Sequence, residues 1–261
     1  MSFFDSRRPL IFAHRGGCAL GPENTLAAFD LGLQAGADGL ELDVHLSADG
    51  LPVVHHDATL DRTTSQAGPL AARTAAELAQ VDAGFRFARN GGFPFRGQGV
   101  GIPSLRDVLL RYRDVPIVIE MKVDSALMGE AVARDVIAAD AVDRVCIAGY
   151  GVRSASAARA ALPGVATSAT HPEVRLAVYR GLAGWPVRHA VYGCFQVPER
   201  TKLVRIVSPR FIRDAHTAEL KVQVWTVDDE SDMRRLLEWG VDGLISNRPD
   251  LAIRVRNTCF P

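Results

Sequence analysis

Short apolar runs rich in β-branched residues alternate with longer runs rich in alanine and leucine along almost the whole chain. The short runs predict strands at residues 10–13, 39–43, 52–56, 116–121, 144–148, 165–168, 190–196, 222–227 and 243–246. The longer runs predict helices at residues 26–35, 105–111, 125–139, 154–161, 173–181, 209–220 and 230–239. This alternation indicates βαβ units in a largely parallel α/β sheet, either closed as a barrel or open and doubly wound. Nine strands are one more than a TIM barrel needs, so we expect one of them to be wrong or an extra.

A repeated sequence segment favours the barrel. Residues 35–41 (AGADGLE) closely resemble residues 239–245 (WGVDGLI). In each segment a helix ends at a glycine suited to a left-handed cap, and an Asp-Gly pair then leads directly into a strand. The same helix-to-strand connection near both ends of the chain is typical of a repeated βα unit, so we expect a TIM (β/α)8-type barrel.

Two places break the alternation. Residues 44–51 are too few for a helical crossover, and Asp49-Gly50 is a turn signal, so we expect the chain to double back there. Residues 57–103 form a long irregular connection rich in glycine, arginine and phenylalanine. Such a connection is more often a functional lid than a failure to fold. The sequence thus predicts one catalytic barrel domain over residues 1–261, with residues 57–103 as an inserted lid-like segment after the third strand.

Charge and cysteine content argue against several classes of function for this chain. The 261 residues include 30 basic and 30 acidic side chains. This balance argues against a strong general affinity for nucleic acid or anionic membranes, although it leaves local patches open. No apolar run approaches the ~20 residues that cross a bilayer, so no stable membrane insertion is expected. The four cysteines are Cys18, Cys146, Cys194 and Cys259; their scatter excludes the common zinc spacings and favours a reducing, cytoplasmic location.

Polar side chains that resist burial follow four of the predicted strands. These ends read His14-Arg15-Gly16-Gly17, Glu41-Leu42-Asp43, Val53-Val54-His55-His56-Asp57 and Ile119-Glu120-Met121-Lys122. In a parallel α/β protein the carboxyl ends of the strands converge on one mouth, where active sites are built. We therefore expect these groups to surround one cavity.

Three of these residues predict a metal site. Glu41 and Asp43 are two residues apart and share a face of their strand, and Glu120 lies at the end of the fourth predicted strand. Three carboxylates around one cavity repel one another unless a cation neutralises them. An all-oxygen set suits one divalent cation, Mg²⁺ or Ca²⁺, rather than zinc.

The remaining groups suit a phosphate ester. Arg15 and Lys122 supply positive charge, and the Gly16-Gly17 backbone allows a phosphate to approach closely. His14 and His56 are the natural proton carriers near neutral pH. Two histidines, a hard metal and two cations together indicate phosphodiester cleavage. His55 faces away from His56 by strand alternation, which predicts a structural role for it.

Each signal also has a plainer interpretation. Glu41-x-Asp43 alone is more often a polar strand end, and Glu120-x-Lys122 alone is more often a surface ion pair. Pro22-Glu23-Asn24-Thr25 is typical of a helix start, with Asn24 or Thr25 as the cap. A Cys18–His14 pair would suggest a thiol hydrolase, but it leaves the carboxylates and cations unexplained. The coincidence of suitable groups at four strand ends favours a catalytic site.

Several motifs in order carry a family resemblance. They are His14-Arg15-Gly16, Pro22-Glu23-Asn24-Thr25, Glu41-Leu42-Asp43-Val44, Val53-Val54-His55-His56-Asp57, Ile102-Pro103-Ser104-Leu105, Glu120-x-Lys122, Val224-Trp225-Thr226-Val227 and Gly240-Val241-Asp242-Gly243-Leu244. From about residue 9 to residue 249 the chain resembles the glycerophosphodiester phosphodiesterase family, whose members are PLC-like phosphodiesterase TIM barrels. One departure is Ser246-Asn247 before Pro249, where the family commonly has Thr-Asp before its proline.

The resemblance implies metal-dependent hydrolysis of small glycerophosphodiesters to glycerol 3-phosphate and an alcohol. It assigns the metal to Glu41, Asp43 and Glu120, acid/base work to His14 and His56, and phosphate binding to Arg15 and Lys122, with Glu23 lining the site and Trp225 as an apolar wall. It also implies that a neighbouring hydroxyl of the substrate attacks phosphorus and that water then opens a cyclic phosphate. Residues 57–100 correspond to the family's inserted segment near the mouth, and we expect them to influence substrate selection.

Two other functions remain open at this point. A lysophospholipase D-type activity would use the same site on lyso-lipids, and the phenylalanines of residues 85–95 would then supply an apolar entrance. A catalytically dead phosphoester-binding protein would keep the barrel without the chemistry. No nucleic acid partner and no particular oligomeric state are predicted.

Overall fold

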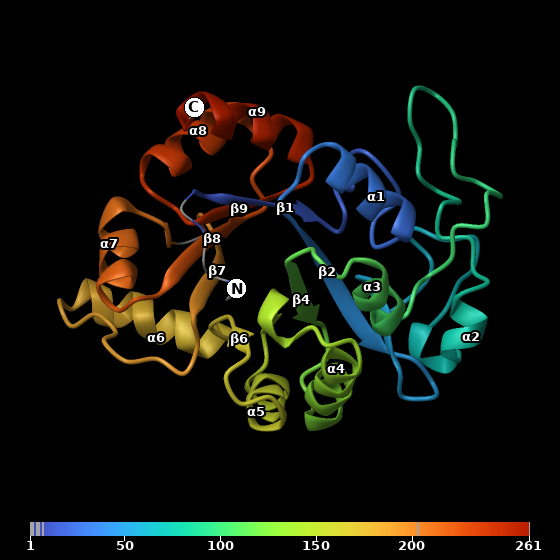
Figure 1. Cartoon of the computed structure of the whole chain (residues 1–261), viewed down its shortest axis with the longest axis horizontal. Coiled ribbons are helices and arrows are strands. Elements are labelled where there is room, and N and C mark those ends of the chain that lie inside the picture. Colours follow the sequence, from blue (N-terminus) through green and yellow to red (C-terminus); the bar gives the residue numbers. More distant parts are fainter. Residues whose placement is uncertain (1–2, 4–5, 7, 203, 261) are drawn as a thin grey trace.

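The computed structural model describes residues 3, 6, 8–202 and 204–260 (Figure 1). Eight parallel strands lie in the order β6-β5-β4-β2-β1-β9-β8-β7, and a parallel bridge between Ser168 and Cys194 brings the two ends of this series together. The strands are β1 (Leu10–His14), β2 (Gly39–Leu46), β4 (Ile117–Met121), β5 (Val145–Gly149), β6 (Ala166–Thr167), β7 (Cys194–Pro198), β8 (Lys221–Trp225) and β9 (Gly243–Ser246). The sheet is therefore a nearly closed α/β barrel, as the alternation predicts.

The extra strand is β3 (Pro52–Val54), which pairs with the far end of β2 in the antiparallel direction. The chain turns at Gly50, whose φ of 72° lies in the left-handed region that glycine tolerates. β3 then runs back toward the mouth, so that the His55 amide donates to the Asp43 carbonyl oxygen at 2.9 Å. His56 thus reaches the mouth because β3 is antiparallel; the expectation that it follows a parallel barrel strand is wrong.

Helices surround the barrel in the order of the strands (Figure 1). They are α1 (Leu26–Gln34), α3 (Leu105–Arg111), α4 (Ala126–Ala138), α5 (Val152–Ala161), α6 (His171–Leu182), α7 (Pro209–Thr217), α8 (Glu230–Glu238) and α9 (Pro249–Cys259). All seven predicted helices are found, with ends that differ by a few residues. Helix α9 was not predicted from the sequence; it begins after Arg248 without a side-chain cap and carries Arg254 and Arg256.

The two similar segments, residues 35–41 and 239–245, have the same local structure. Gly36 and Gly240 both adopt a positive φ directly after a helix, at 96° and 90°. Asp38 then accepts a hydrogen bond from the Ile11 amide at 2.8 Å, and Asp242 accepts one from the Val222 amide at the same distance. In both places the aspartate satisfies an amide at the start of the neighbouring strand, which explains why Gly-x-Asp recurs.

The interior of the barrel changes from apolar to polar along its axis. At the amino-terminal end, Phe12 is fully buried and Phe3 stacks on it, with ring centroids 5.7 Å apart. Val118, Cys146 and Ile245 pack against the same cluster. Because inward-facing positions alternate along each strand, the next inward residues toward the mouth are the polar ones, as the register of His14 beside Glu41 shows.

The inserted segment packs on the flank of the barrel. It contains the one-turn elements η1 (Leu70–Ala72) and α2 (Ala75–Leu78); a third one-turn element, η2 (Val142–Arg144), lies outside the segment and precedes β5. Its own small core packs against β3 and comprises Val53, Leu60, Leu70, Leu78, Val81, Ala83 and Ile102. Beyond this core the chain extends away from the barrel as a loop (Figure 1), where the guanidinium of Arg96 lies 3.7 Å from the Phe93 ring centroid. The phenylalanine therefore packs within the loop itself.

A tight contact fixes α1 against the loop that follows β1. A Cβ atom at Gly32 would lie 2.5 Å from the Gly16 carbonyl oxygen and 2.8 Å from the Ala13 Cβ. Gly16 itself has a φ of 86° and faces the backbone of α1. Only a glycine at position 32 lets α1 approach closely enough to hold this loop.

Gly32→Ala is therefore expected to lower the free energy of unfolding by about 1–3 kcal/mol, because the added methyl forces α1 away from the loop. Gly181→Ala on α6 is the matched control, since the nearest atom to its Cβ would be 3.8 Å away. Alanine at that helical position should be neutral or stabilising by up to about 1 kcal/mol. Urea unfolding of both variants measures the difference, and equal stabilities would show that the contact at Gly32 is not tight.

Candidate active site

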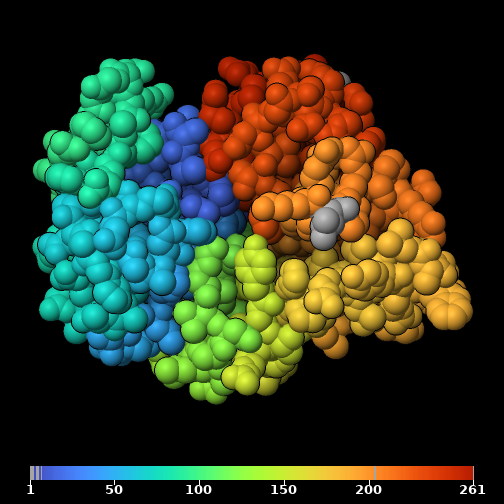
Figure 2. Space-filling view, turned by 180° about the vertical axis from the view of Figure 1, so that it is seen from behind, coloured from blue at the N-terminus to red at the C-terminus, as the bar shows by residue number. Residues whose placement is uncertain are grey.

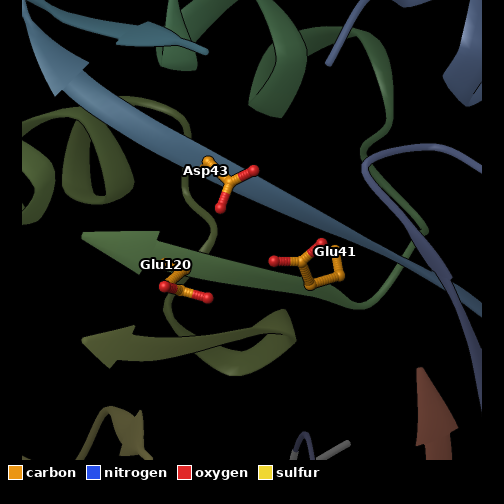
Figure 3. Close-up of side chains that lie close together, drawn as sticks. All are labelled: Glu41, Asp43 and Glu120. Carbon is orange, nitrogen blue, oxygen red and sulfur yellow. The ribbon is translucent and has the colours of Figure 1, made fainter. Parts of the chain in front are cut away.

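Three carboxylates converge at the mouth of the barrel. Glu41 and Asp43 extend from β2 and Glu120 extends from β4, and one oxygen of each lies within 4.8 Å of the others (Figure 3). The strand register places Asp43 directly opposite Glu120. Glu41 and Asp43 are buried, with 3% and 1% of their surface exposed. The structure thus brings together the three residues that the sequence predicts as metal ligands.

This cluster fits a hard divalent cation. Burial raises the pKa of Glu41 well above its usual value, and the neighbouring charges of Asp43 and Glu120 raise it further. The donor atoms are all carboxylate oxygens, which are the ligands that Mg²⁺ and Ca²⁺ prefer. A cation bound to these oxygens would remove the repulsion that raises this pKa.

Lys122 and Arg15 already neutralise part of the cluster. The Lys122 ammonium lies 2.8 Å from Asp43 Oδ1 and 2.7 Å from Glu120 Oε1. Burial by itself lowers the pKa of Lys122, but these two carboxylates outweigh it and raise the pKa. The Arg15 amide donates to Glu41 Oε2 at 2.9 Å, and its guanidinium Nε lies 3.2 Å from Asp43 Oδ2. Both cations line the cavity at the mouth, which is the position a phosphate group requires.

Asn24, which the sequence predicted only as a possible helix cap, belongs to the site. Its amide nitrogen donates to Asp43 Oδ2 at 2.8 Å, and its amide oxygen accepts from the Asp43 backbone at 3.2 Å. Thr25, rather than Asn24, caps α1 by accepting from the Ala28 amide at 3.2 Å. Asn24 has a φ of 58°, a conformation that asparagine tolerates better than most residues. Its role is to hold Asp43 in place.

His14 is oriented by a neutral amide. Asn247 donates through its amide nitrogen to Asp228 at 2.6 Å, so its oxygen faces His14 Nδ1, also at 2.6 Å. That oxygen can only accept, so His14 carries its proton on Nδ1 and leaves Nε2 without one. Nε2 lies 3.9 Å from Glu41 Oε2. Burial lowers the pKa of His14 below its usual value, which keeps the ring neutral at pH 7.

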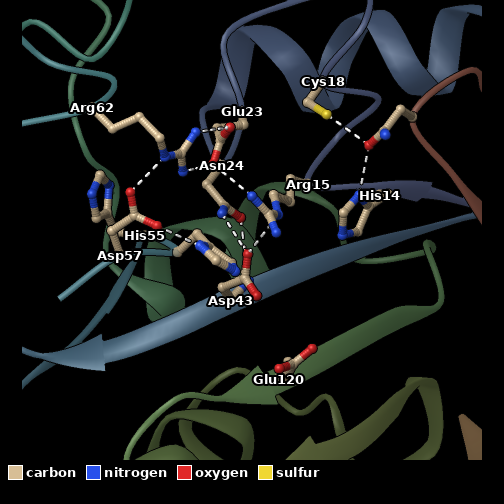
Figure 4. Close-up of polar contacts among 12 residues, drawn as sticks. His14, Arg15, Cys18, Glu23, Asn24, Asp43, His55, Asp57, Arg62 and Glu120 are labelled. Atoms are coloured by element: carbon tan, nitrogen blue, oxygen red, sulfur yellow. Dashed lines mark hydrogen bonds and ion pairs between the residues drawn. The ribbon is translucent and has the colours of Figure 1, made fainter. Parts of the chain in front are cut away.

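The same amide explains Cys18. Its thiol donates to the Asn247 oxygen at 2.7 Å, beside the hydrogen bond from His14 (Figure 4). Burial raises the pKa of Cys18 to about 11. A thiol that is protonated at neutral pH and directed at an amide is a poor nucleophile, so the structure does not support a Cys18–His14 catalytic pair.

His56 is oriented by a carboxylate. Its Nδ1 lies 2.6 Å from Asp57 Oδ1, so Nδ1 carries the proton and Nε2 is the nitrogen left for a substrate. Burial would raise the pKa of Asp57, but hydrogen bonds from Arg62 and His56 outweigh it and hold this pKa well below its usual range. The adjacent His55 instead has its Nε2 3.2 Å from the Thr59 carbonyl oxygen and is buried, as its predicted structural role requires.

Arg62, from the inserted segment, links both sides of the site (Figure 4). It donates through Nε to Asp57 at 2.6 Å and through both terminal nitrogens to Glu23 at 2.8 and 2.7 Å. Glu23 in turn accepts from Arg15 at 2.9 Å. Burial alone would raise the pKa of Glu23, but the hydrogen bonds and charges of the two arginines lower it to about 2. One exposed arginine therefore steadies the partners of both His56 and Arg15.

The candidate catalytic groups open into a cavity of about 560 Å³. The predicted site residues that line it are His14, Arg15, Glu41, His56, Glu120, Lys122 and Trp225. Other residues that line it include Tyr150, His171, Val174, Arg175, Val178, Tyr179, Val204 and Ile206. None of residues 57–103, all of which the structure describes, lines this cavity. The phenylalanines of residues 85–95 thus do not form an apolar entrance to it. The apolar wall comes from α6 and the stretch after β7 instead.

Comparisons with known proteins agree with this site. The sequence model of the glycerophosphoryl diester phosphodiesterase family matches residues 14–251. A glycerophosphodiester phosphodiesterase of Caldanaerobacter subterraneus subsp. tengcongensis is 31% identical over 254 residues, which span 95% of this chain and 98% of that relative. The family match includes all the candidate site residues, from His14 to Trp225.

Two solved structures share the fold. A glycerophosphodiester phosphodiesterase from Agrobacterium tumefaciens gives a TM-score of 0.77 at 30% identity, over 95% of this chain and 99% of that one. A phosphodiesterase from Oleispira antarctica, solved in complex with the product sn-glycerol-3-phosphate, gives a TM-score of 0.75 at 24% identity, over 96% of this chain and 97% of that one. The barrel is therefore shared along its whole length.

Arg62→Gln is expected to lower the free energy of unfolding at pH 7 by about 1–2 kcal/mol, because it removes charged hydrogen bonds to two carboxylates. The pKa of Glu23 is lowered from 4.5 to about 2, so its contribution is complete above pH 4.5 and is lost as the pH falls toward 2. The difference between parent and variant should therefore shrink over that range. Urea unfolding at several pH values measures it.

Arg111→Gln is the matched control, because Arg111 forms a surface ion pair with Asp30 at 2.8 Å and touches no site residue. It should change stability by less than about 1 kcal/mol at pH 7. A pH-independent difference for Arg62→Gln would show that its ion pairs do not stabilise the site.

Proposed function

The chain belongs to the glycerophosphoryl diester phosphodiesterase family, and we propose that it hydrolyses glycerophosphodiesters to glycerol 3-phosphate and an alcohol. The observation that carries the proposal is the meeting of three carboxylates, two cations and two oriented histidines at one cavity. The Caldanaerobacter relative bears the name of this activity, and the Oleispira phosphodiesterase holds its product. In the described part of the chain, no helix is long and apolar enough to cross a bilayer. The cytoplasmic location stays a prediction.

Phosphate binding is assigned to the chain's own cations. Arg15 and Lys122 face the cavity and are held by Glu23, Asp43 and Glu120, so they present fixed positive charge to a phosphodiester. Glu41, Asp43 and Glu120 would hold one divalent cation, Mg²⁺ or Ca²⁺, which supplies further positive charge beside the phosphoryl oxygens when bound. Trp225 lines the same cavity and offers an apolar wall to the glycerol or the alcohol.

The two histidines differ in what they can do with a proton. His14 is neutral with an unprotonated Nε2, so it is assigned as the base that takes the proton from the glycerol hydroxyl as that oxygen bonds to phosphorus. His56 keeps one proton on Nδ1 for Asp57, and a second proton on Nε2 passes to the departing alkoxide as the bond from phosphorus to the alcohol oxygen breaks. Water then opens the cyclic phosphate with the two roles exchanged, which restores both protons.

The first experiment is release of glycerol 3-phosphate from glycerophosphocholine and glycerophosphoethanolamine with EDTA, Mg²⁺ or Ca²⁺. Release should require a cation, because without one the carboxylates repel both one another and the phosphate. Glu41→Gln with Asp43→Asn should abolish release and also the rise in melting temperature that the cation produces in the parent chain.

Glu230→Gln with Asp232→Asn is the matched control, because this pair has the same Glu-x-Asp spacing on the exposed start of α8. It should retain both the activity and the cation effect. Full activity in the Glu41 and Asp43 variant would contradict the metal site, and no release from any diester by the folded parent chain would contradict the proposed function.

The pH profile tests the assignment of His14. A base must be neutral, and burial lowers the pKa of His14 from 6.5, so kcat/KM should rise with pH along a limb centred below 6.5. His14→Ala should lower kcat by ~10²–10⁴-fold and remove that limb, because no base remains to titrate. Initial rates between pH 4.5 and 8 measure both effects.

His189→Ala, at an exposed histidine outside the cavity, is the control and should leave rate and limb unchanged. If kcat/KM of His14→Ala still rises with pH over the same range, the titrating base is a group other than His14.

A further inference from the structure

The outer surface of α6 and the stretch that follows it is unusually apolar. Leu176, Tyr179, Leu182, Trp185 and Val191 expose 56%, 63%, 71%, 76% and 73% of their surface. Val174 and Ala177 on the opposite side of the helix pack into the barrel. Figure 2 shows this stretch, in gold, projecting at the edge of the molecule, opposite the inserted segment in green. We call residues 171–191 the α6 face.

The α6 face is also basic. Arg175, Arg180 and Arg188 are exposed, and none of them forms an ion pair within the described part of the chain. The single acid in residues 171–198 is Glu173, which is paired with Arg159 at 2.9 Å. From the neighbouring α7, Asp214 is paired with Arg210 of its own helix. Three unopposed positive charges therefore lie among the exposed apolar side chains, on a chain with no net charge.

From this combination we infer that the α6 face docks on the surface of an anionic lipid bilayer. Segments with Trp, Tyr and Leu on one surface and arginines beside them lie in the interface of membranes, where the rings and aliphatic groups enter the headgroup region. The arginines then meet the negative potential of the lipids. Arg180 Nε donates to the Trp185 carbonyl oxygen at 3.1 Å, which fixes the loop that carries the indole next to the helix.

A second copy of the chain fits this surface less well. A two-fold symmetric contact would bring the same patch of each copy together, and so would bring Arg175, Arg180 and Arg188 of both copies into one interface. The face contains no free acid to match them. A bilayer with anionic headgroups provides both the apolar layer and the complementary charge.

Docking would direct the cavity toward the membrane. Arg175, Val178 and Tyr179 belong to α6 and also line the cavity that contains His14 and His56. Arg175 and Tyr179 are exposed as well, so the α6 face borders the opening of the site. Binding to the bilayer is independent of the chemistry, whereas the idea that docking brings the site to its substrates rests on the proposed function.

Flotation with vesicles tests the inference. The full chain should float with vesicles of phosphatidylcholine containing phosphatidylglycerol, bind vesicles of phosphatidylcholine alone more weakly, and lose the difference at high salt. Leu182→Glu with Trp185→Glu should lower the bound fraction ~10-fold or more, because it puts charge where apolar groups enter the interface. Arg180→Gln with Arg188→Gln should lower binding to the anionic vesicles only.

Leu127→Glu with Ile137→Glu is the matched control. These α4 side chains are exposed to 56% and 58%, but they lie outside the α6 face. It should float like the parent chain, and all variants should hydrolyse soluble glycerophosphocholine at the parent rate. No flotation of the parent chain, or equal flotation of the Leu182 and Trp185 variant, overturns docking. A parent dimer that the same variant dissociates also overturns it and assigns the face to a second copy. Flotation without hydrolysis supports docking and rejects the proposed function.

Discussion

The repulsion among three buried carboxylates is the constraint around which the mouth of this barrel is arranged. Two unit charges 4–5 Å apart repel by about 3–4 kcal/mol even at an effective dielectric constant of ~20. The chain brings Glu41, Asp43 and Glu120 to within 4.8 Å of one another because β2 and β4 pair with Asp43 opposite Glu120. Lys122 and Arg15 offset part of the charge. The remaining negative charge is the reason a divalent cation suits the site.

The histidines depend on that cluster less than on their own partners. An amide held by Asp228 fixes the tautomer of His14, and a carboxylate held by Arg62 fixes that of His56. Both rings thus leave Nε2 for the substrate, but only one of them has a charged partner. In the proposed mechanism this asymmetry is what assigns one histidine as the base and the other as the acid, although the two side chains are chemically identical. It also gives the inserted segment a role in the site, through Arg62, even though the segment does not line the cavity.

The two flanks of the barrel are built for different tasks. On one flank the inserted segment completes its own small core and sends a single arginine to the site. On the other, α6 lines the cavity with Val178 and Tyr179, and Leu182 at its end and Trp185 after it are exposed. The net charge of the whole chain is zero and therefore does not reveal the unpaired arginines of the α6 face. A partner meets the local charge of the surface it touches.

The order of strands and helices, together with the repeated Gly-x-Asp segment, was enough to predict a barrel from the sequence. The two-residue period of a strand was enough to predict that Glu41 and Asp43 share a face, because alternation along a strand does not depend on the rest of the chain. Tertiary structure alone decided the direction of β3, since a three-residue strand has the same pattern whichever way it runs. It also decided the partners: Asn24 holds Asp43, and Asn247 holds His14 from the other end of the chain. Hydrogen bonds between residues up to 233 positions apart leave no periodic trace in a sequence. The exposure of α6 is equally a property of what packs beside it, not of its own residues.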